Sequence, residues 1–196
     1  GSEMCIRDRS GDVVVVSVNH RLNVLGYLDL SPFGEKYRDS ANAGNLDLIA
    51  ALEWIRDNIE GFGGDPENVT LFGQSGGGVK VWSLLQMPEA DGLFHKGIIE
   101  SGVVDPDLLG DAEDGNGREI VKAMLAELGL EEKDVDQLET LPYDQLAQAY
   151  ENAAPKVAQK GEYVGNHPHK NQSYFGDAIK HGFREETKKI PLLIGT

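Results

Sequence analysis

The sequence is poor in cysteine and in basic side chains, and it contains no long apolar run. Cys5 is the only cysteine among 196 residues, which excludes an internal disulfide and a metal site built from several thiolates, and which fits a reducing compartment. Eighteen lysines and arginines stand against 33 acidic residues, giving a net charge of −15. This charge disfavours nucleic acid and anionic membrane surfaces as partners. The longest largely apolar run, residues 13–18, is far shorter than the roughly 18 residues of a membrane helix.

The first eleven residues have no periodic pattern. Charged side chains are scattered through them, and they lack the apolar stretch of a secretory signal. We therefore predict that residues 1–11 are a leader outside the fold. Residues 12–196 are long enough for one buried core, so we expect one domain there.

Strand-like and helix-like patterns alternate along residues 12–196. Apolar, β-branched runs predict strands at 13–18, 69–72, 97–99 and 191–195, and the first has the composition of a central strand buried on both faces. Apolar residues spaced by three and four predict helices at 45–59, from the end of the second strand to about residue 85, at 118–128 and at 143–158. This order predicts an α/β fold with a mostly parallel central sheet and helices on both faces. Residues from about 106 to 185 form a helical excursion from that sheet.

The segment Gly73-Gln74-Ser75-Gly76-Gly77 has the pattern G-x-S-x-G. In a glycine-rich chain the pattern alone is a weak signal, but here it follows a buried strand and opens a helix, which is the setting of a nucleophile elbow. We expect Gly73 and Gly77 to lack side chains because the turn is tight, and Ser75 to occupy a strained turn with its hydroxyl exposed. The Gly76 amide would then point at a developing oxyanion.

Other glycine-rich sites fit the elbow less well. The segment lacks the G-K-[ST] ending of a phosphate-binding P-loop and the G-x-G-x-x-G spacing of a dinucleotide site. A plain turn, or a helix start that binds phosphate, is the remaining alternative. His167 and His169 suggest a metal only weakly, since no cysteine is near and the helical i, i+4 spacing is absent. We expect neither a metal nor a cofactor.

Four motifs in order resemble the type B carboxylesterases, a family with the α/β-hydrolase fold that includes para-nitrobenzyl esterases and cholinesterases. They are V-N-H-R-L…G-Y-L at 18–28, N-A-G-N-L-D…A-L-E-W-I at 42–55, F-G-G-D-P…V-T-L-F-G-Q-S-G-G at 62–77, and L-F-H…S-G at 93–102. Gln74 and Gly76 replace the usual glutamate and alanine, and Glu100 replaces a frequent glutamine. The resemblance implies that Ser75 attacks a small carboxylic ester to form an acyl-enzyme, and that Ser101 lies close to the triad unless it is a plain strand-end turn.

The resemblance also implies parts that the sequence does not contain. The family's H-G-G-G loop, its triad acid shortly after an I-G-T like that at 194–196, and its histidine about a hundred residues later are absent. We therefore interpret the chain as a partial α/β-hydrolase fold that is inactive by itself. A cholinesterase-like binding module without activity is a further alternative, although Ser75 is retained between intact glycines.

The histidines and carboxylates of the chain itself are weak candidates for the triad. His20 and His95 occupy motif positions that the family does not use for catalysis, and His167, His169 and His181 precede the last strand, where a hydrolase histidine would follow it. We expect none of them within hydrogen-bond reach of Ser75. Glu100 and Asp105 follow the third strand, where some hydrolases hold the acid, but a structural or surface role is favoured. Asp47 is interpreted as a helix-start residue and Trp54 as core.

In the family, the strand that carries the H-G-G-G loop lies between those matching 13–18 and 69–72. We therefore expect these two segments to lie about 10 Å apart, twice the spacing of paired strands, with unpaired backbone between them. In the alternative, the valine-rich segment pairs directly with 69–72.

Overall fold

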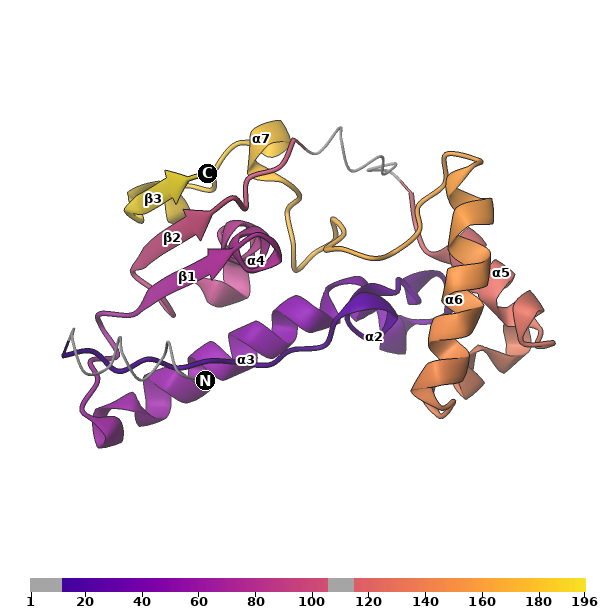
Figure 1. Cartoon of the computed structure of the whole chain (residues 1–196), viewed down its shortest axis with the longest axis horizontal. Coiled ribbons are helices and arrows are strands. Elements are labelled where there is room, and N and C mark those ends of the chain that lie inside the picture. Colours follow the sequence, from indigo (N-terminus) through magenta and orange to yellow (C-terminus); the bar gives the residue numbers. More distant parts are fainter. Residues whose placement is uncertain (1–11, 106–114) are drawn as a thin grey trace.

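The computed structural model describes residues 12–105 and 115–196. The predicted leader (1–11) and the start of the predicted helical excursion (106–114) lie outside the described residues. Three parallel strands form one sheet in the order β1 (Thr70–Gln74), β2 (Lys96–Glu100), β3 (Leu192–Gly195) (Figure 1). Three of the four predicted strands are therefore confirmed, with ends shifted by one or two residues.

The helices lie between and around these strands. They are α2 (Asn23–Tyr27), α3 (Ala43–Asn58), α4 (Gly76–Leu84), α5 (Arg118–Glu127), α6 (Tyr143–Ala158) and α7 (Ala178–His181). Short 3₁₀ turns span Ser31–Phe33, Glu35–Tyr37, Ser40–Asn42, Ile59–Phe62, Pro88–Ala90, Glu132–Glu139 and Thr187–Lys189. The predicted α/β class, with a parallel sheet flanked by helices, is confirmed.

The first core lies between α3, α4 and the sheet. Helix α4 packs on β1 and β2, and α3 packs on α4. Leu48, Leu52 and Ile55 recur along one side of α3 and are buried in this core. On the opposite face of the sheet, Phe72, Ile98 and Leu193 stand side by side in register, and Phe72 and Leu193 are 46% and 67% exposed. Helix α4 therefore sits directly under the end of β1, where the elbow begins.

A second core lies at the other end of the molecule, between α5 and α6 (Figure 1). Leu146, Ala149, Ala153 and Val157 form the buried stripe of α6, with the three- and four-residue spacing of an amphipathic helix. Val24 and Leu28, from α2 and its end, also pack into this core. The segment between α2 and α3 therefore connects the two cores.

The valine-rich segment, residues 13–18, is not a strand of the sheet. Its backbone pairs with no described strand, so among the described strands β1 stands at one side of the sheet. Val13, Val14, Val16 and Val18 are between 39% and 54% exposed. The prediction of a buried central strand is wrong for this chain, because no described strand flanks the segment and most of its valines stay exposed. Direct pairing with β1 is likewise contradicted, and the predicted spacing of about 10 Å stays a prediction.

Candidate active site

Ser75 occupies a strained turn between β1 and α4. Its backbone has φ 53° and ψ −119°, a combination that a residue with a side chain rarely adopts. Such a conformation costs about 1–3 kcal/mol and persists only where the surroundings enforce it. Ser75 is exposed. The predicted strained elbow with an exposed serine is confirmed.

Backbone hydrogen bonds hold this turn against the neighbouring strand ends. The Ser75 N–H donates to the Glu100 carbonyl at 2.8 Å, and the Val79 N–H donates to the Ser75 carbonyl at 2.9 Å. One residue past β2, Ser101 has φ 51°, and its N–H donates to the Gly195 carbonyl at 2.7 Å. The ends of all three strands are therefore tied together beside Ser75.

Of the two glycines that flank the elbow, only Gly73 lacks the space for a side chain. A Cβ on Gly73 would lie 2.3 Å from the Gly77 carbonyl carbon, so Gly73 has no room for a side chain. A Cβ on Gly77, in contrast, would meet no atom within 4 Å. The prediction that Gly77 must lack a side chain is corrected: the backbone of Gly77 crowds Gly73, while its own Cβ direction is open.

A second close approach involves Gly78 and Gly102, which the sequence interpretation did not single out. A Cβ on Gly102 would lie 2.4 Å from the Gly78 backbone, and one on Gly78 would lie 2.8 Å from the Gly102 Cα. The first turn of α4 is thus pressed against the loop that follows β2. The signal was present in the S-G pair at 101–102, which follows a predicted strand.

Gly76 begins α4, so its N–H is among the first amides of the helix, which have no acceptor inside the helix. Gln74, Gly76 and Gly77 are all exposed. An amide at a helix start can donate to a negatively charged oxygen next to it. The oxyanion-hole role of Gly76 stays a prediction.

No described residue accepts or donates a hydrogen bond at the Ser75 hydroxyl. Four histidines bind backbone groups elsewhere: His20 to the Arg21 carbonyl, His95 to the Val69 N–H, His167 to the Pro168 carbonyl and His169 to the Gly115 carbonyl. The ring of His181 packs against Gly176. None of these contacts involves Ser75, and the expectation that no histidine lies within hydrogen-bond reach of its hydroxyl stays a prediction.

Of the two candidate acids, Glu100 and Asp105, only Glu100 contacts the elbow, and it does so through its backbone. Glu100 contacts the elbow through its backbone carbonyl, and its side chain is exposed at the end of β2. Asp105 is exposed in the loop beyond. Nothing in this geometry distinguishes either carboxylate as the partner of a catalytic histidine.

Two other predicted roles are corrected. Asp47 does not lie in the first turn of α3, which begins at Ala43; its carboxylate accepts from the backbone N–H, Nε and Nη2 of Arg21 at 2.9, 2.9 and 2.6 Å. The Arg21 hydrogen bonds lower the pKa of Asp47. Trp54 is 49% exposed and packs on Phe62 rather than in the core, because the buried side of α3 is formed by residues on its opposite face.

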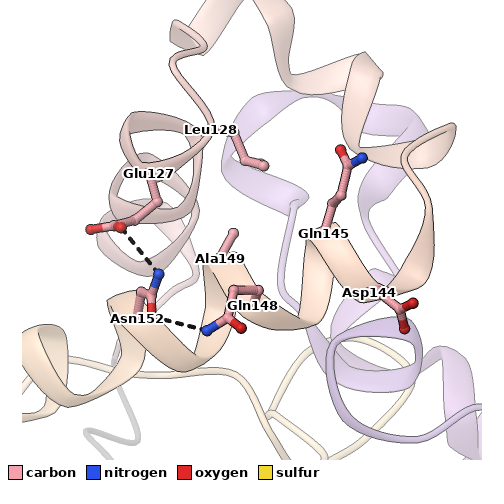
Figure 2. A pocket seen from close by; sticks show the side chains of 7 residues that line it. All are labelled: Glu127, Leu128, Asp144, Gln145, Gln148, Ala149 and Asn152. Carbon is pink, nitrogen blue, oxygen red and sulfur yellow. Dashed lines mark hydrogen bonds between the residues drawn. The ribbon is translucent and has the colours of Figure 1, made fainter.

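A cavity of about 340 Å³ lies between α5 and α6, away from the elbow (Figure 2). Its lining side chains belong to Glu127, Leu128, Asp144, Gln145, Gln148, Ala149 and Asn152. Asn152 donates to Glu127 at 3.4 Å and accepts from Gln148 at 3.1 Å, so these polar groups bind one another. None of the predicted site residues lines this cavity.

The part of the chain that the structure describes contains neither a metal-binding cluster nor a membrane-spanning helix. Its histidine and acidic side chains nowhere gather in the threes that could hold a metal ion. No described helix combines the length and the apolar character needed to cross a bilayer.

Comparison with known proteins gives a consistent result. The sequence model of the family described as "Carboxylesterase family" matches residues 2–196. Para-nitrobenzyl esterase of Bacillus subtilis (strain 168) is 40% identical over 196 residues, covering 95% of this chain and 37% of that protein. Human cocaine esterase is 49% identical over 92 residues, covering 47% of this chain and 16% of that protein.

Solved structures agree with the sequence matches. An esterase from the anaerobe Clostridium hathewayi, described as able to hydrolyze aliphatic aromatic polyesters, has a TM-score of 0.92 and 57% identity, covering 96% of this chain and 37% of its own. A thermophilic PNB esterase has a TM-score of 0.76 and 37% identity, and the match covers 95% of this chain and 38% of that esterase. The chain thus spans little more than a third of the length of these relatives. Because the family model matches nearly every residue and esterases share its fold, the chain belongs to the carboxylesterase family, type B, with an α/β-hydrolase architecture.

Proposed function

We propose that this chain carries the nucleophile of a serine carboxylic-ester hydrolase, and that Ser75 is that nucleophile. The observation that carries the proposal is the strained, exposed conformation of Ser75 at φ 53°, at the junction of a parallel strand and a helix, in a chain of this family. Strained backbone of this kind clusters at active sites, which supports the proposal.

The reaction follows from the groups around Ser75. Its Oγ attacks the carbonyl carbon of a small ester, and the Gly76 N–H at the start of α4 stabilises the oxyanion. Collapse of the tetrahedral intermediate expels the alcohol and leaves an acyl group on Ser75, which water then removes. Gly73 and Gln74 shape the turn from the strand side, and Ser101 and Glu100 support it through the strand ends. Neither a metal nor a cofactor takes part.

The proton transfers in this reaction need a general base at Ser75, and no described histidine hydrogen-bonds to it. This observation favours a second candidate for the chain alone, an inactive segment that hydrolyses nothing until the base and acid are supplied. A binding module without activity is the related alternative.

A chimera separates these candidates. Residues 12–196 replace the matching segment of the 57% identical Clostridium hathewayi esterase, which supplies its remaining residues to the site. We expect the chimera to hydrolyse a nitrophenyl ester and to be labelled by a fluorophosphonate at Ser75, while the 196-residue chain alone does neither.

The matched variants are Ser75→Ala, which should abolish labelling and turnover, and Ser31→Ala, an exposed serine outside the elbow, which should change neither. Labelling that survives Ser75→Ala in a folded chimera would remove Ser75 as nucleophile. Turnover by the chain alone that is lost on Ser75→Ala would instead show an internal base.

A further inference from the structure

Lys80 lies in α4, five residues after Ser75, in surroundings that are unusual for a lysine. Its ammonium sits 4.4 Å from the centre of the Tyr27 ring, and Tyr27 is only 1% exposed. Lys80 itself is half-buried. The face of a neutral aromatic ring attracts a cation but, unlike a carboxylate, carries no negative charge and offers no proton acceptor.

The polar groups next to Lys80 are engaged with one another. The Tyr27 hydroxyl donates to Asn45 Oδ1 at 2.9 Å, and Asn45 Nδ2 donates to Ser83 Oγ at 2.7 Å. Ser83 Oγ in turn donates to the Lys80 carbonyl at 2.9 Å. This chain of hydrogen bonds joins α2, α3 and α4 and fixes the Tyr27 ring under the ammonium.

The charged groups of the same region are also paired without Lys80. Asp47 of α3 accepts three hydrogen bonds from Arg21. Among the described residues, Lys80 forms no ion pair, whereas Lys36, Lys122, Lys133, Lys156 and Lys188 each pair with a carboxylate. Lys80 is therefore a half-buried amine without a counter-ion.

Burial lowers the pKa of Lys80 to about 8. The contrast is Lys36, whose pKa is raised by its hydrogen bonds to Glu139 and Asp136. At pH 7.5 a lysine of pKa about 8 has about a quarter of its amine neutral, against about one part in a thousand for an ordinary lysine of pKa about 10.4. Only the neutral amine is nucleophilic.

We propose that Lys80 is a second acyl-accepting site of this protein, modified on Nζ by small activated esters such as aryl esters. The neutral amine attacks the ester carbonyl carbon, a C–N bond forms, and the C–O bond to the aryl oxygen breaks. The amine proton passes to water and the phenol leaves. The product is a neutral amide, which removes the unpaired charge from the half-buried site.

The test uses the Ser75→Ala variant, so that the outcome does not depend on the proposed hydrolysis. Limiting para-nitrophenyl acetate is added across a series of pH values, and acetylation of each lysine is followed by peptide mass spectrometry. Because intrinsic nucleophilicity falls with basicity, the larger neutral fraction gives a net advantage of about tenfold for Lys80 over Lys133 at pH 7.5. The rate at Lys80 should reach half its maximum near pH 8.

Lys133 is the matched control because it is exposed and paired with Glu131 at 2.7 Å. If Ser75→Ala does not fold, Ser75→Gly replaces it, since glycine accepts the positive φ of this turn. Acetylation of Lys80 no faster than Lys133, or a half-maximal pH near 10, overturns the proposal.

Discussion

At the scale of single residues, the elbow depends on which of its glycines have room for a Cβ atom. Gly73→Ala places a methyl group 2.3 Å from the Gly77 backbone, and backbone cannot yield as a flexible side chain can. We expect a loss of about 1–3 kcal/mol in the free energy of unfolding, or more if the turn rearranges. Urea denaturation followed by circular dichroism measures it.

Gly76→Ala is the matched control, since a Cβ there meets no atom within 4 Å. Alanine is favoured over glycine in a helix by up to about 1 kcal/mol, so this variant should be as stable as the parent or slightly more stable. Equal stability of the two alanine variants would show that the crowding at Gly73 is relieved at little cost.

At the scale of elements, Arg21 and Asp47 join the segment before α2 to α3. Asp47→Asn removes the ion pair and leaves one oxygen for three donors, and solvent screening of the half-exposed Arg21 limits the loss at pH 7 to about 1 kcal/mol. The pKa of Asp47 is lowered in the folded chain, so its contribution is complete above the unfolded pKa of about 3.9 and is lost as the pH falls through the folded pKa. The difference between parent and variant should therefore shrink as the pH falls below about 4 and through the lowered folded pKa.

Unfolding curves of both proteins at several pH values provide the measurement. Asp57→Asn is the control, because Asp57 pairs only with its exposed neighbour Arg56 on the same helix, and it should change stability less. A stability difference for Asp47→Asn that does not shrink at acidic pH, while the protein is still folded, would contradict the assigned ion pair.

Sequence patterns predicted a helix or strand well where its apolar side chains pack against another part of this chain. The prediction for α6 matched its observed bounds because its apolar stripe packs on α5. The prediction for the valine-rich segment was wrong because an apolar, β-branched composition shows that a segment suits a buried strand. It does not show whether neighbouring strands are present to bury it. The prediction that Trp54 lies in the core was wrong for a related reason, since residue type alone does not show which side of α3 faces the core.

The elbow was predictable because a local motif, strand, turn and helix, fixes the backbone of Ser75. The Lys80 and Tyr27 contact and the pairing of Arg21 with Asp47 were not, because they join residues 26 to 53 positions apart. Such contacts arise from packing of α2 and α3 against each other and against α4, and no short pattern encodes them.

At the scale of the whole molecule, exposed apolar side chains predict self-association. The exposed valines of residues 13–18 form an apolar surface that a second copy can cover. Net charge of −15 opposes this, so association should increase when salt screens the charge. Val16→Asp should lower the associated fraction in sedimentation velocity at high salt.

Val103→Asp is the matched control, since Val103 is 37% exposed and Val16 is 39% exposed, and Val103 lies outside the segment. The same decrease in both variants would assign the effect to added charge alone. A parent chain that stays monomeric at every salt concentration would refute association through this surface.

The contact of Gly78 with Gly102 sets a rule for library design around the elbow. Randomising exposed positions near a nucleophile is a common way to change acyl selectivity, and by exposure alone the whole stretch 74–77 qualifies. Gly76 and Gly77 can carry side chains without displacing backbone, whereas every substitution at Gly78 or Gly102 forces α4 away from the end of β2. A library that varies the first pair and holds the second constant explores new side chains while the serine stays where the sheet places it.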